Sequence, residues 1–426
     1  MNKKYGIFFI GLISLLLFGY QHPFSFDATF NQRNSLQPET KAILADIKHP
    51  VELSLYTENP DLREQITDLI SLFQRENPYL HWKKEQTPLD PHQKWRLGLT
   101  SSDQLVIRHQ ETLKAMDINA SRWNEQSFSQ LLYQVLHPEK RWVVFLSGHG
   151  EPNLADPSNR HLSQLAVLLK EKGLAAASLN LNETNNIPDN TALLVIVDPK
   201  TAFLNAEITL IREYLNHGKN LLWAVNPSAN LEPALAEMLG INWLTGTLED
   251  TEAEKKGAPT RLIHLITHYP NHPVTKSLDM LTVFPFATAF SYQKTHALGW
   301  QASPFLITPA SSVLIEKNRY QNGPFTLGAT LTKDNQRIAV LGNTHFFSNA
   351  GIESYGNSAL IQHLIHWLLA DDLLLTLDPP VVPDVYFNPN RFTQLCFSYL
   401  FPYVLPLGFF VFSWYLKRKR YRLLVL

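Results

Sequence analysis

The stretch Trp142–Pro152, WVVFLSGHGEP, decides the fold. Its residues 142–146 form a continuous apolar run, which is typical of a strand buried on both faces of a sheet. Ser147 and the Gly-His-Gly run that follows it predict a sharp turn at the carboxyl end of that strand. Because open α/β sheets place their ligand crevice at this end of their strands, the stretch predicts a buried strand and a candidate site beside it.

The same pattern recurs after this stretch. Apolar runs typical of buried strands lie at 193–197 (LLVIV), 221–225 (LLWAV) and 338–341 (IAVL). Segments with helical spacing lie near 162–173, 206–216 and 357–369. The alternation of strands and helices indicates an α/β domain, with a mostly parallel sheet and helices on both faces. We expect this domain to span residues 139–378, with an exposed acidic loop at 245–260 and shorter, proline-interrupted strands between 261 and 335.

Residues 27–138 predict a smaller α/β domain. Apolar–polar alternation indicates short strands, and apolar residues at helical spacing indicate two amphipathic helices. The chain therefore folds, by this interpretation, into a small βαβ-rich domain followed by the larger one. The expected strands lie at 51–57, 80–85 and 104–109, and the expected helices at 62–73 and 124–136.

Two uncharged apolar segments flank these domains. The first, Tyr5–Tyr20, follows Lys3 and Lys4 and lacks a small-residue cleavage site, so we expect an uncleaved anchor within residues 1–26 rather than a signal peptide. The second lies at 396–416 and is followed by the basic run KRKRYR. Basic residues at both outer ends predict two transmembrane helices with both termini cytoplasmic, in the inner membrane.

This topology places both α/β domains outside the cytoplasm, in the periplasm or its equivalent. A proline-rich linker, residues 379–395, would lead to the second helix and its basic tail, residues 396–426. Cys396, the single cysteine, lies in the second apolar segment, so the predicted ectodomain has neither a disulfide nor a thiol nucleophile.

The composition and the motifs exclude several classes of function. A net charge of -1 with no basic stripe argues against a nucleic-acid partner. The run Gly218-Lys219-Asn220 lacks the upstream glycine and the Ser or Thr of a phosphate-binding loop, so this chain is not expected to hydrolyse ATP. No cofactor is expected.

Polar residues follow each predicted strand of the larger domain. Because the carboxyl ends of parallel strands meet at one edge of a sheet, we expect these residues to line a ligand or partner crevice. They are Ser147, His149, Glu151, Asp198, Asn226, Asn343 and His345. His149 and Glu151 suit a metal ion or an acid–base pair, although a purely structural turn also requires such residues.

Other histidines are weaker candidates for a metal site. His264, His268 and His272 have the four-residue spacing that would align ligands on a helix. Pro270 and Pro273 interrupt any such helix, so we expect no metal there, and no catalytic residue is assigned.

In their order and spacing, these motifs resemble the GldG-like family of auxiliary components of ABC-type transport systems. The likeness rests on the GHGEP turn, the Pro188 to Lys200 strand with its Asp-Pro-Lys end, the Gly218-Lys-Asn-Leu-Leu stretch and the segment 338–349, with an entry segment at 27–51. Two departures are Lys219, where the family has a second glycine, and Asn343-Thr344-His345, where it has Gly-Asp-Ser-like residues.

The resemblance implies a degenerate class I glutamine-amidotransferase-like domain that lacks the catalytic cysteine. It also implies an ABC permease and an ABC ATPase as partners, beside the lipid bilayer that the apolar segments indicate. We therefore expect a non-catalytic auxiliary subunit that binds or docks. The alternatives are a stand-alone scaffold for the envelope or for motility, and an extracytoplasmic hydrolase that uses His149 and Glu151.

Overall fold

The computed structural model describes residues 35–84, 90–92, 95, 103–118, 123–137, 141–227, 232–296, 298–317, 319–371, 398, 403 and 405–422. The chain divides into two units, Met1–Pro379 and Pro380–Leu426. The described part of the first unit holds a four-stranded and a nine-stranded sheet, each with its own apolar core, and two smaller sheets of three and two strands.

The smaller sheet has four strands in the order β2-β1-β3-β4. β1 pairs parallel to β2 and antiparallel to β3, and helices pack their apolar stripes on the sheet. Asn59 caps α3 through its side-chain oxygen, which accepts the N–H groups of Asp61 and Leu62. The elements are α2 (Pro38–Ala45), β1 (Val51–Tyr56), α3 (Pro60–Glu76), β2 (Leu80–Lys84), β3 (Gln104–His109), β4 (Thr112–Asp117) and α5 (Glu125–Leu136).

The larger sheet has nine strands, in the order β6-β5-β7-β8-β18-β17-β13-β9, with β14 paired to β17. The first five strands in this order, from β6 to β18, run parallel. If these five are numbered by their position in the chain, they lie side by side in the order 2-1-3-4-5. The direction of winding therefore reverses between β5 and β7. The parallel strands are β5 (Trp142–Ser147), β6 (Ala175–Asn180), β7 (Thr191–Val197), β8 (Asn220–Ala224) and β18 (Gln336–Leu341).

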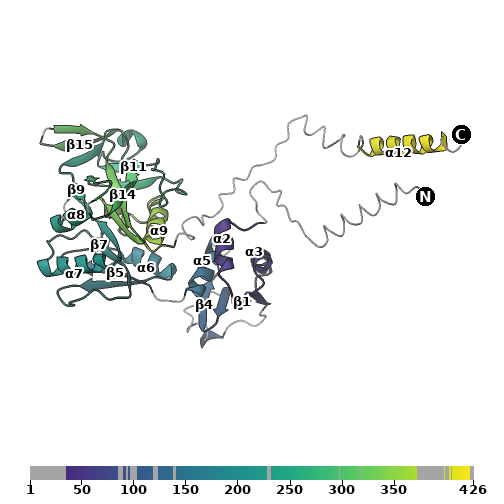
Figure 1. Cartoon of the computed structure of the whole chain (residues 1–426), viewed down its shortest axis with the longest axis horizontal. Coiled ribbons are helices and arrows are strands. Elements are labelled where there is room, and N and C mark those ends of the chain that lie inside the picture. The colour runs from purple at the N-terminus through teal and green to yellow at the C-terminus, as the bar shows by residue number, and fades with distance from the viewer. Residues whose placement is uncertain are drawn as a thin grey trace. The chain divides into compact units, whose positions relative to one another are not determined.

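Helices cover both faces of this sheet (Figure 1). Val143 and Phe145 of β5 pack in the same apolar cluster as α6 and α9, whereas Val144 and Leu146 pack in the cluster of α7 and α8. Side chains of a strand alternate between faces, so a strand covered on both faces needs an unbroken apolar run, as the sequence predicted. The helices are α6 (Ser163–Glu171), α7 (Asn205–Asn216), α8 (Pro233–Leu239) and α9 (Asn357–Leu368).

The region between β8 and β18 is richer in strands than the sequence indicated. The prediction of an exposed loop at 245–260 is wrong in part, because β10 and a 3-10 helix lie there and Asp250 is fully buried. The Asp250 carboxylate accepts hydrogen bonds from the Ser311 hydroxyl and the Glu252 N–H, which offsets the cost of burying it. Four antiparallel strands make the larger sheet mixed rather than mostly parallel, namely β9 (Ile241–Trp243), β13 (Phe290–Tyr292), β14 (Gln301–Ile307) and β17 (Thr326–Lys333). The other strands of this region form two small sheets of their own. One contains β10 (Thr247–Asp250), β15 (Ser312–Glu316) and β16 (Arg319–Asn322), and the other contains β11 (Ile263–Ile266) and β12 (Thr282–Pro285).

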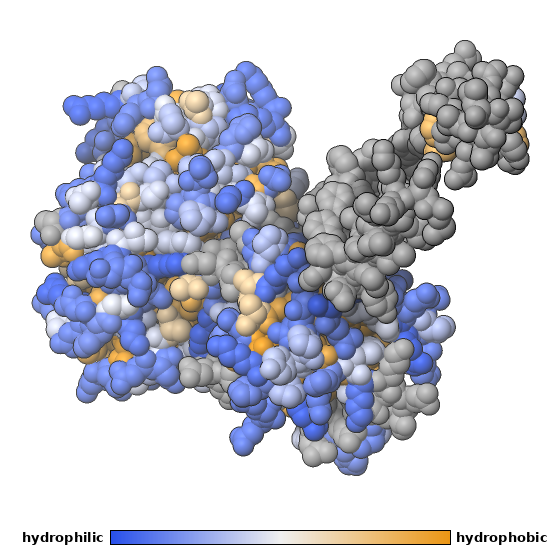
Figure 2. All heavy atoms as spheres, turned by 45° about the vertical axis from the view of Figure 1, so that its right-hand side comes forward, coloured by the Kyte–Doolittle hydropathy of each residue, from blue (hydrophilic) through white to orange (hydrophobic). Residues whose placement is uncertain are grey.

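The second unit contains α12 (Leu405–Arg422), which begins inside the predicted apolar segment and continues through the basic run. Among the described residues, no helix combines the length and the apolar character that crossing a membrane would need. The predicted first segment, 5–20, and the part of 396–416 before residue 405, apart from residues 398 and 403, lie outside the described residues. Large apolar side chains of α12 are exposed, namely Leu407, Phe409, Phe410, Val411, Phe412 and Trp414. By contrast, the face of the first unit seen in Figure 2 is mostly hydrophilic, with scattered apolar spots.

Candidate functional site

The loops after β5, β7, β8 and β18 meet at the carboxyl edge of the parallel strands. The reversal between β5 and β7 lies at this edge, and such switch points are where open α/β sheets form crevices. All seven residues predicted from the sequence belong to these strand ends. The structure places His149 and Glu151 in a buried cluster and Asn226 and His345 at an open pocket. Ser147, Asp198 and Asn343 belong to neither group.

The Gly-His-Gly turn after β5 depends on the backbone freedom of glycine. Gly148 and Gly150 have φ angles of +112° and +88°, which side-chain-bearing residues rarely adopt. A Cβ atom on Gly150 would lie 3.1 Å from the side chain of Lys200. The His149 carbonyl accepts the N–H groups of Lys200 and Thr201 at 2.7 and 3.2 Å, so the turn is joined to the loop after β7.

His149 lies at the centre of the buried cluster. Only 6% of this residue is exposed, and the edge of its ring contacts Phe203, with ring centroids 4.5 Å apart. Its Nε2 lies 3.0 Å from Glu207 Oε2, and its Nδ1 lies 3.5 Å from Glu151 Oε1. The other Glu151 oxygen accepts the backbone N–H of His149 at 2.6 Å. His149 and Glu151 therefore lie in contact with each other in the buried cluster.

Glu207 and Glu232 join the cluster, although the sequence reasoning did not select them for the site. Glu207, in the first turn of α7, accepts the Leu204 N–H at 2.7 Å, and Glu232, just before α8, accepts the Phe203 N–H at 3.0 Å. Burial raises the pKa of the Glu232 carboxyl, and the Phe203 N–H and His149 oppose that rise. The only feature of the sequence that could have pointed to this cluster is Glu207, an acidic residue at the start of a predicted helix.

Three carboxyl groups thus surround one imidazole in a site closed to solvent. In the described part of the chain, no group of three or more His, Cys, Asp or Glu side chains has a geometry that could hold a metal ion. The cluster is suited to holding three loops together.

Asp198 and Lys200 connect the buried cluster with the open pocket, because Lys200 is hydrogen-bonded to His149 and Asp198 acts electrostatically on His345. Asp198 has a φ of +54°, and its carboxylate pairs with the Lys200 ammonium at 2.8 Å. Lys200 also donates its backbone N–H to His149, as described above. Asp198 acts on the pKa of His345, which burial lowers and the Asp198 charge partly restores.

Asn226 and Asn343 shape the strand ends. The Asn226 side chain binds Thr344, accepting its N–H at 3.0 Å and donating to its hydroxyl. Asn343 donates to the Pro285 carbonyl at 2.6 Å and accepts the Phe346 N–H at 3.0 Å. Both amides are engaged by the protein itself, which favours a structural role.

The open pocket lies beside β8 and β18 and has a volume of about 360 Å³. His345 and Asn226 contribute to its polar side, and Phe286 to its rim. We call it the strand-end pocket. Its lining is Asn226, Pro227, Gly246, Thr247, Leu248, Leu262, Phe286, Ala287 and His345. Ser147, the last residue of β5, pairs with Asn180 of β6 and does not line this pocket.

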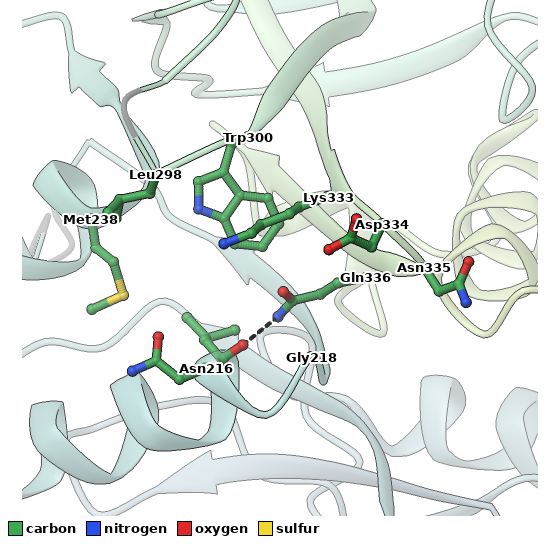
Figure 3. A pocket seen from close by; sticks show the side chains of 10 residues that line it. Asn216, Gly218, Met238, Leu298, Trp300, Lys333, Asp334, Asn335 and Gln336 are labelled. Carbon is green, nitrogen blue, oxygen red and sulfur yellow. Dashed lines mark hydrogen bonds between the residues drawn. The ribbon is translucent and has the colours of Figure 1, made fainter.

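A second pocket, of about 300 Å³, lies at the amino ends of β8 and β18, the opposite edge of the sheet (Figure 3). The Gln336 side chain donates to the carbonyls of Leu215 and Lys219 at 2.9 and 2.6 Å. Lys333 lies over the ring of Trp300, 5.8 Å from its centroid. These contacts connect a hairpin turn to the end of α7, and their position is not where such sheets usually bind ligands.

The three evenly spaced histidines share no helix. His264 lies in β11, and burial lowers its pKa to about 4. Burial likewise lowers the pKa of His272 to about 4, and its Nε2 lies 2.8 Å from the Thr330 hydroxyl. His268 is exposed.

The fold and the site together define an α/β domain with an occluded His–Glu cluster and a small pocket at its strand ends. Residues 140–359, slightly more than half of the chain, match the family described as ABC-type uncharacterized transport system. The chain belongs to this family, as an auxiliary component, which confirms the resemblance seen in its motifs.

No curated protein matches the chain. Among solved structures, the mmIFT52 N-terminal domain has 19% identity and a TM-score of 0.43, covering 53% of this chain and 96% of that one. A ThuA-like protein from Bacteroides uniformis has 16% identity and a TM-score of 0.33, covering 54% and 91%. A GMP synthase component from Thermoplasma acidophilum has 9% identity and a TM-score of 0.33, covering 55% and 96%. Scores this low carry no argument about function.

Proposed function

We propose that this chain is a non-catalytic subunit that binds or docks in an ABC-type transport system, through an α/β ectodomain outside the cytoplasm. The family match carries the proposal, because it spans the domain that holds the strand-end pocket and the His149 cluster. The ectodomain would contact the permease or the transported substrate at this edge of the sheet. Its larger domain would be the degenerate amidotransferase-like domain that the resemblance implies.

The partners would be an ABC permease and an ABC ATPase. The sequence contains no phosphate-binding loop, so ATP hydrolysis would require a separate chain. Its two apolar segments are too few for a multi-helix translocation pathway, so the pathway would also belong to a partner.

The lipid bilayer of the inner membrane would hold both ends of the chain. Two uncharged apolar segments, Tyr5–Tyr20 and 396–416, support this topology. Basic residues lie on the outer side of each segment, which favours cytoplasmic termini. The exposed apolar side chains of α12 also favour it, because burying them in lipid removes them from water.

The enclosure of His149 favours a binding subunit over the alternative of a hydrolase. A general acid or base must come within hydrogen-bond reach of the substrate, but this residue is only 6% exposed, and carboxylate oxygens of Glu207 and Glu151 lie 3.0 and 3.5 Å from its two ring nitrogens. The double variant His149→Ala, Glu151→Ala distinguishes the two, since a hydrolase would lose activity while remaining folded.

Affinity purification of the tagged, full-length chain from solubilised membranes, followed by mass spectrometry, tests the proposal. We expect an ABC ATPase and a multi-span permease to be recovered in amounts comparable to the bait. A matched bait that carries only residues 27–378 shows whether the terminal segments are needed for docking. Recovery of the intact bait without either partner would contradict the proposal and favour a stand-alone scaffold.

A further inference from the structure

We propose that the strand-end pocket binds a small aromatic compound that carries a hydroxyl group. The proposal deepens the proposed function, because it names the class of substrate that the ectodomain would present to a transport system.

The pocket has the size and lining of a small-molecule site. A volume of about 360 Å³ accommodates a single-ring compound, and sites of this kind are mostly apolar with a few polar groups. The side chains of Leu248, Leu262 and Ala287 supply apolar surface, and Leu248 and Ala287 are almost fully buried. These side chains favour an apolar ring over a sugar or a free ion.

His345 supplies the polar contact. Asn226 is occupied by Thr344, whereas within the described part of the chain no hydrogen bond engages the ring nitrogens of His345. Burial lowers the pKa of this imidazole, so the ring is neutral near pH 7 and offers one N–H donor and one acceptor nitrogen. A ligand hydroxyl can satisfy either of them.

Phe286 forms an aromatic wall beside this group. Its ring is tilted 53° from the His345 ring, with centroids 5.7 Å apart, and the residue is 49% exposed. Its φ of +53° is unfavourable for a side-chain-bearing residue, and its N–H is held by the Leu262 carbonyl at 2.8 Å. Such strained residues cluster at ligand sites. Two rings at this angle provide a face and an edge against which a third ring can pack.

The test compares p-cresol with toluene, which differ only in the hydroxyl group, on the full-length purified chain in lipid nanodiscs. Saturation-transfer NMR, with empty nanodiscs subtracted, measures the affinity for each compound. We expect p-cresol to bind about fivefold more tightly, the effect of one hydrogen bond. His345→Phe keeps a ring in place but removes the donor and acceptor, and it should abolish that difference.

Phe286→Gly separates loss of binding from loss of folding. Glycine adopts a positive φ without strain, so the variant should remain folded and yet bind p-cresol at least tenfold more weakly. Asp334→Gly is the matched control, because Asp334 also has a positive φ, +53°, but lines the pocket at the opposite edge. It should bind p-cresol as the wild type does. Ala287→Leu, which fills the pocket, should also weaken binding.

Equal affinity for p-cresol and toluene, or unchanged p-cresol binding in Phe286→Gly and Ala287→Leu, would overturn this assignment. Binding is measured without any partner chain. A negative result here with successful recovery of the ATPase and permease would therefore remove the ligand class and leave the proposed function intact.

Discussion

The Gly-His-Gly turn shows how single residues position the site. Gly150 needs its positive φ and also its missing side chain, since the side chain of Lys200 occupies the adjacent space. Gly218 has a similar φ of +74°, but no atom lies within 4 Å of where its Cβ would be. A comparison of substitutions at these two positions therefore separates the effect of backbone strain, which both share, from the effect of a steric contact, which only Gly150 has.

We expect Gly150→Ala to lower the free energy of unfolding by about 2 kcal/mol, and Gly218→Ala by about 1 kcal/mol. Both substitutions place alanine in the left-handed region, but only the first also displaces Lys200. Urea denaturation followed by circular dichroism measures the difference. Equal losses in the two variants would mean that the loop after β7 adjusts freely.

Glu232 should make stability depend on pH. Burial raises the pKa of this carboxyl in the folded state, so its ionisation opposes folding. Its contribution to stability is present below the unfolded pKa of about 4.3 and is lost as the pH rises through the folded value. Glu232→Gln, which keeps an acceptor for the Phe203 N–H, should be more stable than the wild type at pH 7 and gain nothing at pH 4.

The matched control for this charge removal is Glu213→Gln, at an exposed position of α7. It should change stability by less than about 0.5 kcal/mol at either pH. Thermal unfolding of the three proteins at the two pH values provides the comparison. A gain in Glu232→Gln that is the same at both pH values would exclude the protonation argument.

The sequence predicted the residue types at the strand ends but not which of them meet. His149 and Glu151 are close in the chain, so their pairing was predictable. Glu232 follows His149 by 83 residues, and only the sheet order brings the loops after β5 and β8 to the same cluster. Asn226 and Asn343 were expected to face a ligand, but an amide side chain serves a turn equally well.

At the scale of elements, prediction succeeded where burial imposes a distinctive pattern. The strands β5, β7, β8 and β18 are covered on both faces, and their unbroken apolar runs identified them. The edge strand β6, AAASLN, was missed, because alanine has weak strand propensity and its side chains are mostly half-buried. β10, TLED, was missed because only one of its four residues is apolar, and its buried Asp250 is hydrogen-bonded to Ser311 and Glu252.

Asp371 joins three elements after the end of α9. Its Oδ1 accepts the Tyr133 hydroxyl of α5 at 2.8 Å and the Arg141 guanidinium at 2.7 Å, and 3% of the residue is exposed. Although burial opposes it, hydrogen bonding to His366 and Arg141 holds the pKa of Asp371 below its usual value. The stability from this group is thus present above the unfolded pKa of about 3.9 and is lost as the pH falls through the folded value.

We expect Asp371→Asn to lower the free energy of unfolding by about 3 kcal/mol at pH 7, because it leaves Arg141 without its anionic partner. The loss should shrink as the pH falls below about 4. Asp279→Asn, at an exposed position, is the control and should have almost no effect. Chemical denaturation at pH 7 and pH 3.5 measures both, and a loss that does not depend on pH would argue against an ionic role.

At the scale of the whole molecule, the terminal segments should determine where the protein is found. Under the proposed topology, alkaline carbonate leaves the full-length chain in the membrane pellet, whereas residues 27–378 alone appear in the soluble fraction. The reason is that only the full chain carries two apolar segments long enough to resist extraction. Immunoblotting of the fractions gives the result, and release of the full-length chain by carbonate would contradict membrane insertion.

The insertion between β8 and β18 has a consequence for the order in which the protein becomes functional. Asn226 and His345 face one pocket, yet 119 positions separate them in the chain. A ribosome adds residues from the amino end, so most of the larger domain emerges before the second wall of the pocket exists. Occupancy of the pocket would therefore report that synthesis of this domain is nearly complete, and a truncated product that ends within the insertion could not compete for the same ligand.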